Sequence, residues 1–273
     1  MQHPGGAGHL VGVFDSGVGG LSVLKAIRRQ RPDMDFTYIA DSLYAPYGQR
    51  PPAFIEARAA SIADALLQAG ARIIVVACNT ATAVAVEKLR ARLPVPLIAM
   101  EPAIKPAVAH TRSGVVGVLA TTRTLESANV ARLCREFGHG VQVLLQPCPG
   151  LVERVEQGDL YSAATRDLLL QFTTPLLAKG VDTLVLGCTH YVFLTPLIRE
   201  LVGEAVSIIE SSEAVARHTL RHVEPVASAA DVPRTRREIF LTTGVPGEVQ
   251  AVFSQLWGAP VEVSALGGDH VGA

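Results

Sequence analysis

The chain has 273 residues, of which 49% are hydrophobic and only 5% aromatic, so we expect a core built from Ala, Val, Leu and Ile. This length is close to the limit for one hydrophobic core, which favours two lobes. The formal net charge of −1 argues against nucleic acid or an anionic membrane surface as the main partner.

The opening residues, MQHPGGAGHL, lack the basic and long apolar regions of a secretory signal. No apolar run approaches the ~18 residues that a membrane span needs. We therefore expect a cytoplasmic protein without a membrane contact, whose four cysteines are reduced thiols. Because the sequence contains no Cys-x-x-Cys pair, we predict no metal site.

The first half of the chain alternates between short apolar runs and helical patterns. The apolar runs predict strands at 10–14, 36–40, 73–77 and 97–100. The patterns between them predict helices at 21–29, 53–69 and 81–92. The first two strands are followed by the loops DSGVGG (15–20) and LYAPYGQRPP (43–52), and loops at strand ends often carry functional residues.

The same order of strands returns at an offset of about 105–110 residues, which is far above the period of a solenoid. The matching runs are 115–120, 141–146, 183–187 and 206–210. Four landmarks in one order at nearly one offset indicate a duplicated unit. The tail is predicted to complete the first lobe with a surface loop at 222–233, strands at 238–242 and 261–265, and a helix at 248–256.

We therefore predict an α/β fold of two similar Rossmann-like or flavodoxin-like lobes related by a pseudo-twofold axis. Each lobe contains an open, mostly parallel sheet with helices on both faces, and the active site lies in the cleft between the lobes. The predicted first lobe comprises residues 1–100 plus 211–273, and the second comprises residues 101–210.

Each copy of the unit carries a cysteine at the same place. Cys78 follows Gly70 in LLQAGARIIVVACNTAT, and Cys188 follows Gly180 at the same spacing in LLAKGVDTLVLGCTHYV. Both are predicted at the C-terminal end of a buried strand, where α/β folds bind ligands. A helix that begins there would lower the pKa of the thiol. One buried Cys is usually inert packing, but two at matched positions favour chemistry.

Two equivalent thiols fit more than one kind of protein. A redox protein would form a disulfide between them, and a non-catalytic binding module could dispense with one of them. In a racemase, a thiolate removes a proton from one face of a carbon and a thiol returns a proton to the other face. The symmetry of the sequence favours this last reaction.

Residues near the thiols have both structural and functional interpretations. The DSGVGG loop matches neither a dinucleotide fingerprint nor a P-loop, so Asp15 is either a helix cap or a proton relay. His190 could tune Cys188 or simply pack. Glu153 and Glu156 are by default solvated. Threonines 121, 122 and 124 are either carboxylate binders or caps, and we take Cys134 and Cys148 as structural.

The motifs FDSGVGGLSVL, ADSLYAPYG, VACNTAT and LGCTHY occur in this order, and with them the chain resembles the glutamate racemases of the aspartate/glutamate racemase superfamily over nearly its whole length. The resemblance implies a cofactor-independent isomerase that interconverts L- and D-glutamate and supplies D-glutamate for peptidoglycan. An aspartate racemase is the nearest alternative, and the CTHY sequence favours glutamate. The oligomeric state, a homodimer included, is left open.

The resemblance also implies roles for particular residues. Cys78 and Cys188 would be the acid/base pair, assisted by Asp15 and His190, with Glu156 as the acidic residue of the second lobe. The implied substrate contacts, to which we add Thr121, are Asp15, Ser16, Tyr47, Gly48, Asn79, Thr80, Thr189 and His190.

Overall fold

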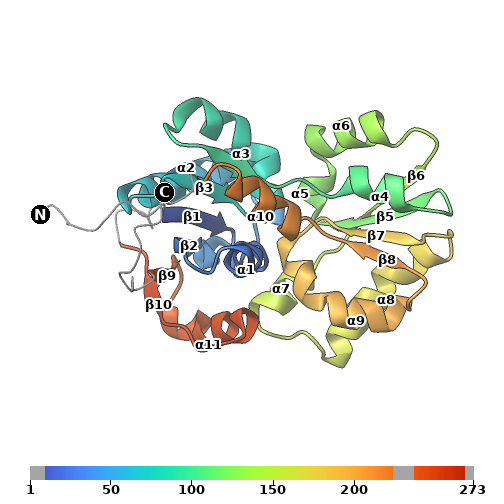
Figure 1. Cartoon of the computed structure of the whole chain (residues 1–273). Helices are drawn as coiled ribbons and strands as arrows, with labels where there is room; N and C mark the ends of the chain where they lie inside the picture. Colours follow the sequence, from blue (N-terminus) through green and yellow to red (C-terminus); the bar gives the residue numbers. More distant parts are fainter. Residues whose placement is uncertain (1–9, 224–236, 268–273) are drawn as a thin grey trace, which may run out of the picture.

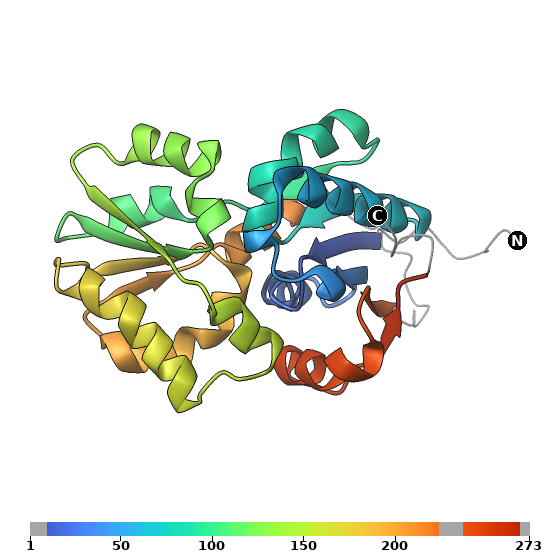
Figure 2. The ribbon, with the colours of Figure 1, turned by 180° about the vertical axis from the view of Figure 1, so that it is seen from behind.

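A computed structural model describes residues 10–223 and 237–267, which form two parallel sheets covered by helices on both faces (Figures 1 and 2). The larger sheet has the strand order β10-β9-β2-β1-β3-β4, and the smaller has the order β6-β5-β7-β8. We call each sheet, with the helices packed on it, a lobe. The fold class predicted from the sequence is confirmed. Most of the loop predicted at 222–233 lies outside the described residues.

The first lobe is formed by both ends of the chain. Its first part comprises β1 (Leu10–Asp15), α1 (Leu21–Gln30), β2 (Asp35–Ala40), the 3-10 helices η1 (Ser42–Tyr44) and η2 (Tyr47–Gln49), α2 (Pro52–Gln68), β3 (Ile73–Val76), α3 (Asn79–Arg92) and β4 (Leu97–Ala99). The chain returns to this lobe as α10 (Ser212–Leu220), β9 (Glu238–Thr242), α11 (Pro246–Trp257) and β10 (Val263–Ala265). The tail therefore extends the first sheet, as predicted.

The second lobe lies between these two parts of the chain. It comprises α4 (Ile104–His110), β5 (Val115–Ala120), α5 (Thr122–Leu125), α6 (Ala128–Phe137), β6 (Gln142–Pro147), α7 (Leu151–Glu156), α8 (Ala163–Leu177), β7 (Thr183–Leu186), η3 (Thr189–Leu194), α9 (Thr195–Val202) and β8 (Ser207–Ile209). Among the described helices, none is long and apolar enough to cross a bilayer.

The duplication is visible in the strand orders, because β2-β1-β3-β4 and β6-β5-β7-β8 follow the same pattern. In each lobe, the turn before the cysteine-bearing strand contains a glycine in the left-handed region. Gly70 has a φ of 92° and Gly180 a φ of 83°, a conformation that costs glycine little and other residues more. The matched Gly-to-Cys spacing therefore reflects one turn used twice.

The strands read as continuous apolar runs because both faces of each sheet are covered. In β3, Ile73 and Val75 pack with the helices on one face, while Ile74 and Val76 pack with α2 and α3 on the other. The first of these clusters also contains buried residues of the second lobe, such as Leu151 and Tyr191. The two lobes therefore share one hydrophobic core.

A buried ion pair anchors the loop that follows β2. The Arg58 guanidinium on α2 donates two hydrogen bonds to Asp41, from Nε at 3.0 Å and Nη2 at 2.9 Å, and both side chains are fully buried. Asp41 also accepts bonds from the Tyr47 hydroxyl at 2.5 Å and the Thr243 hydroxyl at 2.8 Å. This carboxylate therefore joins the loop to α2 and to the end of β9.

Replacing Arg58 by Met is expected to lower the free energy of unfolding by about 3–5 kcal/mol, because the Asp41 carboxylate would stay buried without its cation. Urea unfolding followed by circular dichroism measures this. The control is Arg92→Met, which breaks a half-exposed pair with Asp64 and should cost less than about 1 kcal/mol. Equal small losses in the two variants would contradict the anchoring role of Arg58.

Candidate active site

The two thiols lie at corresponding ends of the two sheets. Cys78 follows β3 and is the N-cap of α3, while Cys188 follows β7 and precedes η3. The helical turn after Cys188 is a 3-10 helix, and the α-helix predicted there begins only at Thr195. The side chains are 4% and 6% exposed and both are free thiols. Each sulfur therefore sits at the carboxyl edge of a parallel sheet, the usual ligand-binding edge.

Both thiols line one small cavity between the lobes, with a volume of about 10 Å³. Of the nine predicted substrate contacts, all but Asp15 line it as well. The lining residues are Ser16, Pro46, Tyr47, Gly48, Cys78, Asn79, Thr80, Thr121, Val152, Cys188, Thr189 and His190. The structure thus gathers residues from six separate stretches of sequence around a space that holds about one water molecule.

Asp15 stands directly behind Cys78. Its Oδ1 accepts the Ser16 amide at 2.7 Å, and its Oδ2 accepts the Gly20 amide at 2.7 Å. Oδ2 also accepts the Thr189 hydroxyl of the second lobe at 3.2 Å. Burial raises the pKa of Asp15, although the charge of His190 and a hydrogen bond from Cys78 act in the opposite direction. Asp15 therefore both caps the loop and contacts the thiol, so the two interpretations of this residue are compatible.

The pKa expected for Cys78 was wrong in direction. Its position at a helix start, where its Sγ accepts the Ala81 amide at 3.5 Å, favours the thiolate. Burial and the negative charge of Asp15 outweigh this effect and raise the pKa of Cys78 well above its ordinary value. Cys78 is therefore a protonated thiol at rest, and it needs a nearby base to become a thiolate.

Cys188 has a different partner. Its Sγ lies 3.7 Å from His190 Nδ1, and His190 Nε2 lies 2.6 Å from Glu156 Oε1 on α7. Burial would lower the pKa of His190, but its hydrogen bonds with Cys188 and Glu156 raise the pKa well above the ordinary value. The two thiols are thus served by unlike groups, a carboxylate at Cys78 and an imidazole–carboxylate pair at Cys188.

Asn79 carries an unsatisfied amide at the cavity. The residue is 4% exposed, and neither its Nδ2 nor its Oδ1 has a hydrogen-bond partner among the described residues. An unsatisfied buried polar group costs about 1–3 kcal/mol, so such groups are usually kept for a function. The amide supplies a donor and an acceptor for a polar group bound beside Cys78.

Three threonine hydroxyls meet across the cleft. Thr80 Oγ1 lies 3.0 Å from Thr121 Oγ1 and 3.2 Å from Thr124 Oγ1, and the last two lie 3.0 Å apart. Thr80 belongs to α3 of the first lobe, whereas Thr121 and Thr124 belong to the start of α5 in the second. Thr121 is also the N-cap of α5, so this one residue both caps a helix and lines the cavity.

Several residues at the site were not predicted from the sequence. Pro46 and Val152 line the cavity, and the Val18 amide donates to Glu156 Oε1 at 2.8 Å. Asp41 accepts a hydrogen bond from the Tyr47 hydroxyl. The position of Asp41 directly after β2 was the one feature of the sequence that could have indicated its role. Glu153, in contrast, lies at the surface, where it accepts a bond from Gln49 at 3.3 Å.

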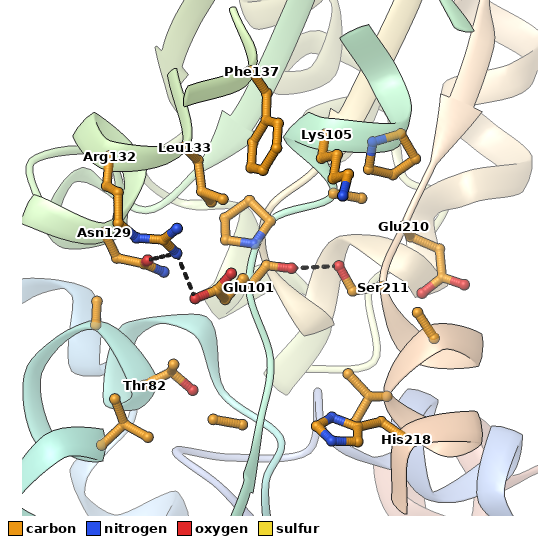
Figure 3. Close-up of a pocket in the computed structure, with 18 of the residues that line it drawn as sticks. Thr82, Glu101, Lys105, Asn129, Arg132, Leu133, Phe137, Glu210, Ser211 and His218 are labelled. Atoms are coloured by element: carbon orange, nitrogen blue, oxygen red, sulfur yellow. Dashed lines mark hydrogen bonds and ion pairs between the residues drawn. The ribbon is translucent and has the colours of Figure 1, made fainter. Parts of the chain in front are cut away.

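A much larger cavity, with a volume of about 910 Å³, lies where the chain crosses between the lobes (Figure 3). It contains none of the predicted site residues. Part of its polar lining is already paired, since Glu101 contacts Arg132 at 3.1 Å and the Glu101 carbonyl accepts the Ser211 hydroxyl at 2.6 Å. The larger of these two cavities thus contains neither thiol, so cavity volume alone would not locate the predicted site.

Known proteins resemble this chain over most of its length. A glutamate racemase from Pseudomonas aeruginosa is 50% identical over 261 residues, which cover 94% of this chain and 97% of that relative. The crystal structure of a glutamate racemase isoform from Bacillus anthracis superposes with a TM-score of 0.84 at 31% identity, covering 96% of this chain and 98% of the other.

A second crystal structure, of Escherichia coli glutamate racemase with L-glutamate and the activator UDP-MurNAc-Ala, superposes with a TM-score of 0.82 at 32% identity. It covers 95% of this chain and 98% of the other. Residues 12–219 match the family model described as Asp/Glu/hydantoin racemase. With the two-lobe fold and its paired thiols, these similarities show that the chain belongs to the Asp/Glu/hydantoin racemase family.

Proposed function

We propose that this protein interconverts L- and D-glutamate without a cofactor, using Cys78 and Cys188 as the two acid/base groups. One observation carries the proposal: two buried thiols, from equivalent positions of a duplicated unit, line one cavity. Similarity to glutamate racemases, one of them solved with L-glutamate, supports the choice of substrate.

In one direction, a Cys78 thiolate takes the α-proton and the Cys188 thiol gives a proton to the opposite face of the same carbon. The turnover leaves the protonation states of the thiols exchanged, which prepares the site for the reverse reaction. Since the pKa of Cys78 is raised, Asp15 is the group that accepts its proton before reaction. At Cys188 the partner is the imidazole of His190, held by Glu156, which exchanges a proton with the Cys188 sulfur.

The α-proton is far less acidic than a thiol, so the developing charge on the α-carboxylate needs stabilisation. Asn79, Thr80 and Thr189 offer donors on the two sides of the cavity. One such preorganised donor lowers the barrier by about 3–4 kcal/mol, by analogy with oxyanion holes. We assign the predicted substrate contacts at Ser16, Tyr47, Gly48 and Thr121 to the same bound glutamate.

Glutamate cannot fit a cavity of about 10 Å³, so loading requires the lobes to move apart and reaction requires them to close. The division into residues 1–100 plus 211–273 and residues 101–210 is our proposal for the two moving parts. Closure then excludes water from the thiols and strengthens every electrostatic contact in the site.

The proposed reaction places the protein in the cytoplasm, because both thiols must stay reduced. Its product, D-glutamate, would be used for peptidoglycan. All the groups named in this mechanism belong to one chain, so the reaction itself requires no second copy. The sequence leaves the oligomeric state, a homodimer included, open.

Replacing Cys78 or Cys188 singly by Ser is expected to lower the racemisation rate in both directions by about 10²–10⁴-fold, because each direction needs both groups. The change in circular dichroism of purified L- and D-glutamate measures the rate. Cys134→Ser, on α6, is the control and should keep it. A near-normal rate in either active-site variant would contradict the two-thiol mechanism, and activity on aspartate alone would favour the alternative substrate.

Replacing Asn79 by Leu should abolish racemisation while leaving the free energy of unfolding unchanged or higher by about 1–2 kcal/mol, because an unsatisfied buried amide is removed. Unfolding and activity are measured on the same sample. Asn129→Leu, which removes a hydrogen bond from Arg132 outside the site, should keep activity. A large loss of stability in Asn79→Leu would show that its amide has a structural partner.

A further inference from the structure

We propose that Gly17 and Gly19, with the Val18 amide between them, position the Glu156–His190 pair of the second lobe behind Cys188. The first lobe would thereby complete the acid–base machinery of the second. This inference rests on the proposed two-thiol reaction and adds to it three residues of the DSGVGG loop, whose glycines the reaction itself leaves unexplained.

The glycines at these positions are not required by backbone conformation. Gly17 and Gly19 do not adopt the left-handed φ seen at Gly70 and Gly180. Glycine is required instead because side chains of the second lobe approach the backbone closely at these two positions. A Cβ atom on Gly17 would lie 2.6 Å from Glu156 Cδ and overlap Oε1, and a Cβ atom on Gly19 would lie 2.6 Å from His190 Cε1. The loop backbone therefore forms the surface against which both side chains rest.

The Val18 amide fixes the Glu156 carboxylate directly. Glu156 Oε1 accepts the Val18 amide at 2.8 Å and faces His190 Nε2 at 2.6 Å. A carboxylate only accepts, so Nε2 carries a proton and Nδ1 is left facing Cys188 at 3.7 Å. One backbone amide of the first lobe thus sets the orientation of the imidazole beside the second thiol.

The loop is itself held rigidly from behind. The Tyr38 hydroxyl, on β2, donates to the Gly17 carbonyl at 2.6 Å. Asp15 Oδ2 accepts the Gly20 amide at 2.7 Å. A surface fixed at both ends can hold a side chain to the fraction of an ångström that proton transfer requires.

The test begins with Gly17→Ala. Its Cβ meets the end of a side chain that is partly accessible, so Glu156 can move aside and the fold should survive. Racemisation should fall about 10²-fold, the cost of misplacing a catalytic group by about 1 Å. The control is Gly247→Ala on α11, where no described atom lies within 4 Å of the added methyl group. It should keep both activity and melting temperature.

A double variant separates positioning from general damage. If Gly17→Ala acts by displacing Glu156, then Gly17→Ala combined with Glu156→Ala should be within about 2-fold of Glu156→Ala alone. A loss of activity in the double variant equal to the product of the two single losses would overturn the proposal. Full activity in a folded Gly17→Ala protein would overturn it as well.

Solvent exchange at the α-carbon gives a second readout. Because the two enantiomers are equal in energy, net racemisation must fall equally in both directions, whereas exchange of each enantiomer reports the thiol that deprotonates it. Gly17→Ala should slow exchange mainly for the enantiomer whose exchange is lost in Cys188→Ser. Equal slowing of both enantiomers would overturn the proposal. If the wild-type protein racemises neither enantiomer, the proposed function itself fails, and the two failures are thereby distinguished.

Discussion

The carboxyl ends of β3 and β7 face one another across a buried gap, and the arrangement of the site depends on how narrow that gap is. Each parallel sheet must be covered on both faces, which leaves its strand ends as the place where backbone polar groups and side chains are available. The duplication supplies two such edges and one thiol on each. A shared hydrophobic core then holds the edges together.

The two thiols have unlike neighbours. Burial raises the pKa of Cys78, and the carboxylate of Asp15 raises it further. At Cys188 the neighbouring group is His190. Its hydrogen bonds with the Cys188 sulfur and with Glu156 raise the pKa of His190, so the imidazole is protonated. The backbone is therefore nearly symmetric while the acid–base chemistry is not. Such asymmetry is compatible with a reaction whose substrate and product are mirror images, since the overall equilibrium constant is fixed by the enantiomers alone.

Much of the fold could be predicted from the sequence. The matched Gly-to-Cys spacing predicted the duplicated strand and turn, and the tail was correctly assigned to the first sheet. Helix and strand ends were less accurate: the helix expected at 53–69 runs from Pro52 to Gln68, and a 3-10 helix follows Cys188. Such ends depend on capping and on packing from the other lobe, which local pattern does not record.

The site was harder to predict because much of it comes from contacts distant in sequence. Nothing near Val18 indicates that its amide meets Glu156, which lies 138 positions further along the chain. The pKa direction of Cys78 was mistaken for the same reason, because the helix start is visible in the sequence and the depth of burial is not. Gly17 and Gly19 are visible in the sequence as part of a glycine-rich loop. The need for glycine there comes from side chains of the other lobe, which the local sequence does not show.

The most direct test of the account is solvent-deuterium exchange into L- and D-glutamate by the purified protein, followed by NMR without any added cofactor. The account predicts deuterium at Cα together with formation of the opposite enantiomer from either starting isomer. Failure of glutamate to exchange or invert, with the folded protein present and aspartate tested alongside, would contradict the central claim that two buried thiols racemise glutamate.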